Sequence, residues 1–169
     1  MCDVSCQHLS CLTSLQEFHI SKYAAISHMA LHDIGPLQQL TRLQIQCASW
    51  HMDLHRIPGF AEMTGLRHLE VYDSKEINPE ILAAMTNLEH LAIVKTGLKP
   101  SGVSAQEAMG VPMLLSILPE MQQLTCLHLV NCLNWPQPPQ AYAALTASPR
   151  LARLILRCGG YSYTIAFCG

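Results

Sequence analysis

The chain has 169 residues, of which 50% are hydrophobic and only 13% are charged, and its net charge is −2 with nine histidines counted as neutral. This charge balance provides no strong positive field for a phosphate backbone, so we do not expect nucleic-acid binding. No stretch approaches the roughly eighteen consecutive apolar residues of a membrane span, and the first residues do not have the pattern of a secretory signal.

One six-residue pattern, Leu-x-x-Leu-x-Leu, recurs six times with its apolar positions in the same phase. These positions are Leu15, Phe18 and Ile20; Leu40, Leu43 and Ile45; Leu66, Leu69 and Val71; Leu88, Leu91 and Ile93; Leu124, Leu127 and Leu129; and Leu151, Leu154 and Leu156. Internal repetition with a period of about 20 to 30 residues indicates a solenoid. We expect a single domain over 1–169, with strands near 15–20, 40–45, 66–71, 88–93, 124–129 and 151–156.

The repeated pattern resembles the leucine-rich repeat family, whose consensus continues with Asn or Cys at the ninth position and an apolar residue at the eleventh. The repeat that begins at Leu88 matches best, with Thr96 and Leu98 at these positions. The next repeat has Cys132 at its ninth position. The resemblance implies an α/β fold: a curved horseshoe of about six repeats, with parallel strands on the concave face and short 3₁₀, helical or loop returns on the convex face.

The segments between the strands carry apolar residues at every third position in places. Examples are Leu31, Ile34 and Leu37 before Leu40; Leu54, Ile57, Phe60 and Met63 before Leu66; and Leu115, Leu118 and Met121 before Leu124. This spacing predicts 3₁₀ or loosely helical turns, because residues i and i+3 eclipse there. Five prolines also fall in these segments and none within the repeated pattern, as expected of strands paired on both sides: Pro36, Pro58, Pro79, Pro119 and Pro149.

Two parts of the chain depart from the regular repeat. The interval from Leu88 to Leu124 is 36 residues (88→124) and contains the segment Lys99 to Met113, which is either a tolerated surface insertion or a loop that touches a partner. After Leu156 we expect a turn at Gly159-Gly160 and the first part of another return. No polar cap is evident at either end, so we expect self-association through uncapped ends, and the chain is either complete or a piece of a longer array.

Several groups of cysteine and histidine residues have spacings that could suggest a metal. They are Cys2, Cys6, His8 and Cys11; His28 and His32; and His51 and His55. The first group lacks the separated Cys-x2-Cys pairs of zinc ribbons, and neither histidine pair forms the HExxH motif, so we favour free thiols and solvated histidines over a metal-binding protein. No nucleophile elbow, P-loop or dinucleotide fingerprint occurs, so we expect no enzyme, no metal and no cofactor.

Strand alternation directs the third, fifth and seventh residues of each repeat away from the leucine core. We call the surface formed by these three columns the outer face, which is the concave side of the expected horseshoe. Six strands about 4.8 Å apart would make it about 24 Å long, enough for a modest protein interface. The candidate partner-binding residues on this face are Glu17, His19, Arg42, Gln44, His68, Glu70, Tyr72, His90, Val94, His128, Val130 and Arg153.

The outer face is expected to differ along its length. Repeats four and five contribute Ala92, Val94, Cys126 and Val130, an apolar strip that we expect to be accessible and to serve as an anchor. His68 and His90 share one column in adjacent repeats, and His19 and His128 lie in another, so binding is expected to depend on pH between about 6 and 7.

These patterns favour a non-catalytic protein-interaction module or scaffold that binds another protein, of unknown identity, through its outer face. The alternative is a structural, internal fragment of a longer repeat protein. The resemblance suggests settings such as the substrate-recognition arm of a ubiquitin ligase or a cytoskeletal or axonemal repeat protein. We expect a cytoplasmic location, with association to cytoskeleton or axoneme as one version of it.

Overall fold

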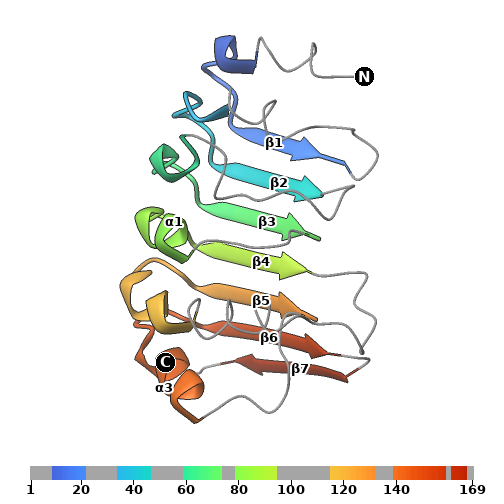
Figure 1. The fold of residues 1–169 in the computed structure, drawn as a ribbon, viewed down its shortest axis with the longest axis vertical. Helices are drawn as coiled ribbons and strands as arrows, with labels where there is room; N and C mark the ends of the chain where they lie inside the picture. The colour runs from blue at the N-terminus through green and yellow to red at the C-terminus, as the bar shows by residue number, and fades with distance from the viewer. Residues whose placement is uncertain are drawn as a thin grey trace.

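The sheet of this protein follows the order of its repeats. A computed structural model describes residues 9–21, 34–46, 59–73, 79–94, 115–131, 139–158 and 161–166. They form one seven-stranded sheet whose strands lie in chain order, and the first six run parallel (Figure 1). The strands are β1 (Glu17–Ile20), β2 (Arg42–Gln46), β3 (His68–Tyr72), β4 (His90–Val94), β5 (Cys126–Val130), β6 (Arg153–Cys158) and β7 (Tyr161–Ala166). The predicted leucine-rich repeat solenoid is confirmed.

The strands pair in the register that the repeat predicts, with equivalent positions side by side. Leu43 pairs with Leu69, and this column of leucines continues through Leu91, Leu127 and Leu154. All five leucines are at most 1% exposed, because each packs against its equivalents on the neighbouring strands. Full burial of one such side chain contributes about 1.5–3 kcal/mol relative to exposure, so the column is a main source of stability.

Each strand begins two residues after the first leucine of its repeat, later than the sequence suggested. The reason is that this leucine still belongs to the preceding turn: the N–H of Leu40 donates to the carbonyl oxygen of Leu37 at 3.0 Å. The same bond recurs at Leu15, Leu66, Leu88 and Leu124. The first leucine therefore closes a tight turn, and its side chain still enters the core at four of these five positions.

The second residue of each repeat starts the backbone ladder. The carbonyl oxygen of Gln16 accepts the N–H groups of both Thr41 and Arg42, at 2.8 and 3.0 Å. Four further carbonyls accept two N–H groups of the next repeat in the same way: those of Thr41, Arg67, Glu89 and Thr125. Because the arrangement repeats at every parallel interface, it fixes the register of the whole stack before the strands begin.

The predicted 3₁₀ turns occur before several strands, along the edge where the strands start (Figure 1). Two of them span Phe60–Glu62 and Leu118–Glu120, and a turn that was not predicted spans Leu9–Cys11. Two α-helices, α1 (Pro79–Ala84) and α3 (Pro139–Ala147), occupy the equivalent place elsewhere. One turn approaches its neighbour so closely that a Cβ atom on Gly65 would lie 2.8 Å from the carbonyl oxygen of Gln38. Only glycine fits there without a shift of the backbone.

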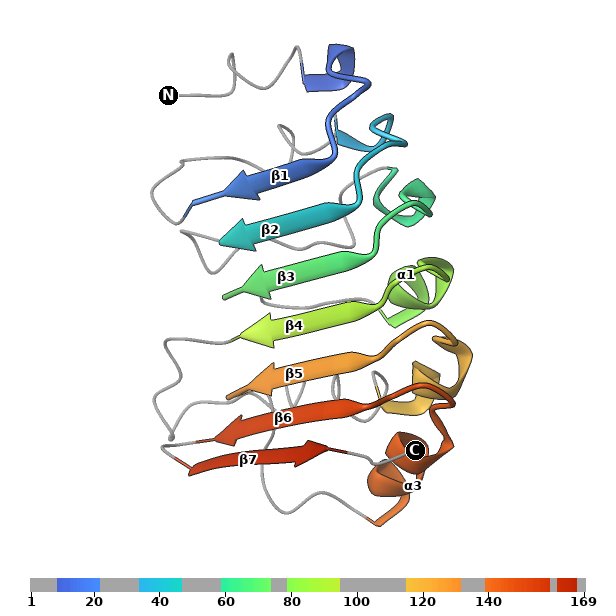
Figure 2. The ribbon, with the colours of Figure 1, turned by 180° about the vertical axis from the view of Figure 1, so that it is seen from behind.

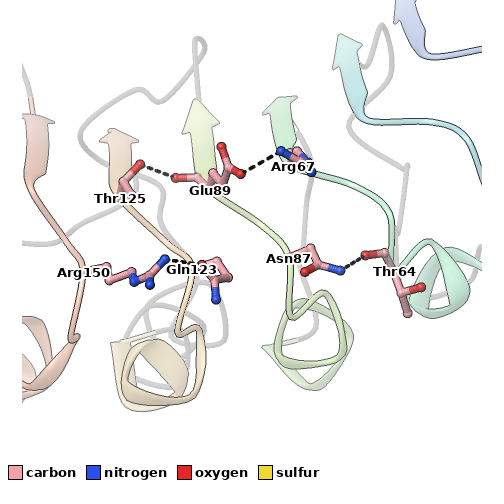
Figure 3. A network of polar contacts seen from close by, with 7 residues as sticks. All are labelled: Thr64, Arg67, Asn87, Glu89, Gln123, Thr125 and Arg150. Carbon is pink, nitrogen blue, oxygen red and sulfur yellow. Dashed lines mark hydrogen bonds and ion pairs between the residues drawn. The ribbon is translucent and has the colours of Figure 1, made fainter.

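Polar side chains connect successive repeats along the same edge (Figure 3). The Asn87 amide donates to the carbonyl oxygen of Thr64 at 2.8 Å, and Arg150 donates to the Gln123 side chain at 2.6 Å. Arg67 pairs with Glu89 at 3.3 Å, although both side chains are at least half exposed. Exposed ion pairs contribute little to stability, so we assign these contacts to alignment of the turns and the main stabilisation to the leucine columns.

The segment after Leu156 differs from our expectation. It is not the start of another return: β7 pairs antiparallel with β6, from Cys158 opposite Tyr161 to Arg153 opposite Ala166, and its arrow is reversed in Figure 2. Only residues 159 and 160 separate the two strands, and a connection of two residues favours a hairpin. The sequence of β7 contains two tyrosines, a threonine and an isoleucine, which suit a strand better than a 3₁₀ turn.

Several expectations concern residues outside the described ranges. These residues are Cys2, Cys6, His8, His28, His32, His51, His55, Cys132, the segment 99–113 and the glycines 159 and 160. In the part of the chain that is described, no helix is long and apolar enough to cross a bilayer.

Candidate functional site

The outer face is built by strict alternation on β2, β3 and β5. On β3 the side chains of Leu69 and Val71 are buried, whereas those of His68, Glu70 and Tyr72 are half-buried and point to the other side of the sheet. The same alternation holds on β2 and β5. The predicted columns therefore exist on these strands, and their polar side chains lie at fixed positions relative to one another.

The predicted site residues differ in exposure along the stack. Glu17, His19, Arg42 and Arg153 are exposed; Gln44, His68, Glu70, Tyr72, His90, His128 and Val130 are half-buried; and Val94 is buried. The structure brings the residues of β3 together with Arg42 on β2 and His90 on β4. It leaves Glu17 and His19 on the first strand, away from this group.

The expected accessibility of the apolar strip is wrong for two of its residues. Ala92 is 2% exposed and Val94 is 8% exposed, although both lie on the outer face. Ala92 has the shortest side chain of its column and lies between Glu70 and His128, which are its paired residues on β3 and β5. Val94 lies in the same way between Tyr72 and Val130. The neighbours of Ala92 are longer on both sides, and Val94 has the larger Tyr72 on one side, so we infer that both side chains support the surface from below.

A carboxylate lies at the centre of the polar group on β3. Glu70 Oε1 is 2.5 Å from His68 Nε2, and Glu70 Oε2 accepts a hydrogen bond from the Tyr72 hydroxyl at 3.0 Å. The Arg42 guanidinium approaches Oε1 at 3.7 Å from β2. Burial raises the pKa of Glu70, but the hydrogen bonds from His68 and Tyr72 and the charges of His68 and His90 together outweigh it, so its pKa is lowered overall. The carboxylate is therefore charged and held in place at neutral pH.

His90 extends this group onto β4. Its ring stacks on that of His68, with centroids 4.0 Å apart and planes within 2° of parallel, and the two residues are paired in the sheet. His90 Nδ1 is buried and has no hydrogen-bond partner. Burial and then the charge of His68 lower the pKa of His90 to about 4. The expected pH dependence between about 6 and 7 is therefore wrong for His90, which titrates at lower pH.

The next strand contributes further half-buried groups. His128 Nε2 on β5 is also buried without a hydrogen-bond partner, and burial together with Arg157 lowers the pKa of this histidine. Burial raises the pKa of the Cys126 thiol, which is free. The middle of the outer face thus carries one charged carboxylate and two histidines with lowered pKa values, His90 and His128, with arginines toward its flanks.

Sequence reasoning missed that Glu70 completes this group. The histidine column of His68 and His90 was visible from the repeat phase, and Glu70 lies two residues from His68 on the same face. The missing step was to combine neighbouring columns as well as neighbouring repeats. One nitrogen of each histidine and one carboxylate oxygen all lie within 4.8 Å of one another, a geometry that could hold a metal ion.

Comparisons with known proteins point to no specific activity. No family model matches the chain, and no curated protein matches it. Among solved structures, the crystal structure of an internalin (inlF) from Listeria monocytogenes str. 4b F2365 is similar, with 20% sequence identity and a TM-score of 0.35. The match covers 88% of this chain and 50% of the internalin, so the chain spans half the length of the protein it matches. Its in-register parallel strands give it a leucine-rich repeat fold.

Proposed function

We propose that this chain is a non-catalytic module that binds a protein partner through the outer face of its sheet. The observation that supports the proposal most is the group Arg42, His68, Glu70 and Tyr72, whose side chains are accessible yet held by mutual hydrogen bonds and an ion pair. Side chains that are already ordered lose less conformational entropy on binding, so such a surface is suited to recognition.

The size and chemistry of the surface agree with this role. Seven strands with six gaps of about 4.8 Å make the sheet about 29 Å wide, which suits an interface of standard size. Tyrosine and arginine are among the residue types that most often dominate binding energy, and Tyr72 and Arg42 both contact Glu70 on this face. We therefore propose that the centre of the footprint lies at β2 and β3, with the buried Val94 as apolar support for Tyr72.

The test is partner capture with surface variants. The double variant Tyr72→Ala and Arg42→Ala removes the two proposed anchors, whereas Thr86→Ala and Gln122→Ala remove exposed side chains from turns outside the outer face. We expect partners recovered by the wild type and the turn variant to be lost, or weakened at least about ten-fold, with the double variant. Equal recovery by all three folded proteins would contradict the proposal. Val94 is unsuitable for this test, since its replacement would change packing.

A further inference from the structure

We propose that His68, Glu70 and His90 form a binding site for a divalent metal ion of the zinc class. The proposal goes beyond protein recognition and does not depend on it. It starts from the register of the sheet, which places His68 directly opposite His90 on adjacent parallel strands. Glu70 follows two residues later on β3 and therefore points to the same side.

The donor atoms are already close together. Ring nitrogens of the two histidines and a carboxylate oxygen of Glu70 all lie within 4.8 Å of one another. Two imidazole nitrogens and one carboxylate oxygen are a donor set that suits zinc and its neighbours among the transition metals. Calcium and magnesium prefer oxygen ligands throughout, so the two nitrogens disfavour them. Three protein ligands also leave a position for water or for a side chain of a partner.

The surroundings of the carboxylate resemble the support that metal ligands need. Tyr72 donates a hydrogen bond to Glu70 Oε2 and so orients the carboxylate whose other oxygen faces His68. Such outer partners orient the ligands, and their loss typically weakens metal binding about 10- to 100-fold. His90 Nδ1 is buried without a hydrogen-bond partner, so this ring nitrogen is uncommitted to the protein.

Two features must change when a metal enters. His68 Nε2 faces Glu70 Oε1 at 2.5 Å, so ligation through Nε2 requires its proton to reside on Nδ1 and this hydrogen bond to give way to the ion. Arg42 approaches the same oxygen at 3.7 Å and competes as a cation. Its side chain is 47% exposed and has room to move into solvent. The site therefore predicts opposite effects for its two neighbours: Tyr72 assists metal binding and Arg42 opposes it.

The test is calorimetric titration of zinc into the chelator-stripped full chain. Glu70→Gln keeps the shape of the side chain and removes its charge, and His90→Ala removes a ligand. We expect each of these two variants to lower the zinc affinity of the proposed site by at least about ten-fold. Tyr72→Phe should lower the same affinity by about ten-fold. Arg42→Ala should raise the affinity of the same site. His19→Ala, a histidine on the outer face of β1, is the matched control and should leave it unchanged.

Cobalt(II) in place of zinc distinguishes this site from the cysteines of the chain, because thiolate ligands give a charge-transfer absorption that nitrogen and oxygen ligands do not. We expect the bound cobalt to give a visible spectrum that lacks the thiolate absorption. Glu70→Gln should abolish this spectrum. Zinc uptake that is equal in the wild type, Glu70→Gln and His90→Ala would overturn the proposal, as would no uptake by the wild type. Circular dichroism checks that the variants fold, and if His90→Ala does not fold, Glu70→Gln decides the question.

Discussion

β1 and β4 carry the same repeated pattern but occupy different environments. On β4 four of the five residues are buried, including two on the outer face, whereas on β1 only Ile20 is buried. β4 pairs with strands on both sides, and within the described residues β1 pairs only with β2. Burial in this fold therefore depends on the position of a repeat in the stack. The Leu-x-x-Leu-x-Leu pattern alone does not reveal how deeply each residue is buried.

The difference between β4 and β1 should be largest in the core. Leu88 and Leu15 are the first leucines of their repeats, and Leu88 is 1% exposed while Leu15 is only half-buried. Leu88→Ala should lower the free energy of unfolding by about 3 kcal/mol through lost burial and a cavity. Leu15→Ala should lower it by about 1 kcal/mol, because part of its surface is already in water. Denaturant unfolding of both variants measures the difference, and equal losses would show that the first leucines of the two repeats are equally buried.

A second contrast concerns the seventh position of the repeat. Val94 on β4 is 8% exposed, whereas Ser21 occupies the same position after β1 and is exposed. Val94→Glu places a charge under Tyr72 and Val130 and should cost about 2–3 kcal/mol of unfolding free energy. Ser21→Glu should stay within about 0.5 kcal/mol of the wild type. If Val94→Glu lowers the free energy of unfolding no more than Ser21→Glu does, the outer face of β4 is open to solvent.

The middle of the sheet should also respond to acid. His90 has a pKa of about 4 in the folded protein, against 6.5 for the free side chain, because of burial and the nearby charges of His68, His128 and Arg42, which Glu70 partly offsets. Between these values the unfolded chain holds more protons, so the stability of the metal-free protein should fall as pH drops from about 6.5 to about 4. The effect is on the order of 1 kcal/mol, since half-exposed groups are screened by solvent.

Unfolding measured against pH tests this dependence, with His90→Gln as the control that lacks the titrating group. In this variant, the free energy of unfolding should fall less steeply between about pH 6.5 and about pH 4. Glu70 affects stability at lower pH. Its pKa is lower in the folded protein than its ordinary value of 4.5, so the carboxylate stabilises the fold above pH 4.5, and this stabilisation is lost as the pH falls through the pKa of the folded state. An identical slope for the wild type and His90→Gln would contradict the assignment to His90.

The smallest expected effect is a difference in thiol reactivity. Cys126 lies on the outer face of β5 with its pKa raised by burial, and Cys11 is exposed. The thiolate is the reactive form, so Cys126 should react with iodoacetamide more slowly, by about ten-fold. Mass spectrometry of the labelled peptides measures both rates in one sample. Faster reaction at Cys126 would show that its strand is less enclosed than the account states.

The sequence was sufficient for the parts of the fold that repeat. The phase of the leucines predicted the pairing of Leu43 with Leu69 and Leu91, because equivalent residues of stacked repeats share an environment. It did not predict β7, since the pattern ends at Leu156 and the pairing of Tyr161 with Cys158 depends on a short connection rather than on the repeat.

The candidate site was predictable in position but not in detail. The columns placed His68 and His90 side by side, yet the contact between Glu70 and His68 depends on side-chain rotamers, which periodicity does not encode. The burial of Val94 likewise depends on the size of Tyr72 on the neighbouring strand. Repetition therefore reveals which residues share a face, and packing between unlike neighbours decides which of them are exposed.

The most direct test of the central claim is amide hydrogen exchange of the whole chain, followed residue by residue by NMR. Stability should be highest where strands have neighbours on both sides and lowest at the first strand. We predict that the amides of Leu91 and Ile93 exchange only through global unfolding and that those of Phe18 and Ile20 exchange through local opening at lower free energy. Equal protection of β1 and β4, or stronger protection of β1, would contradict the account.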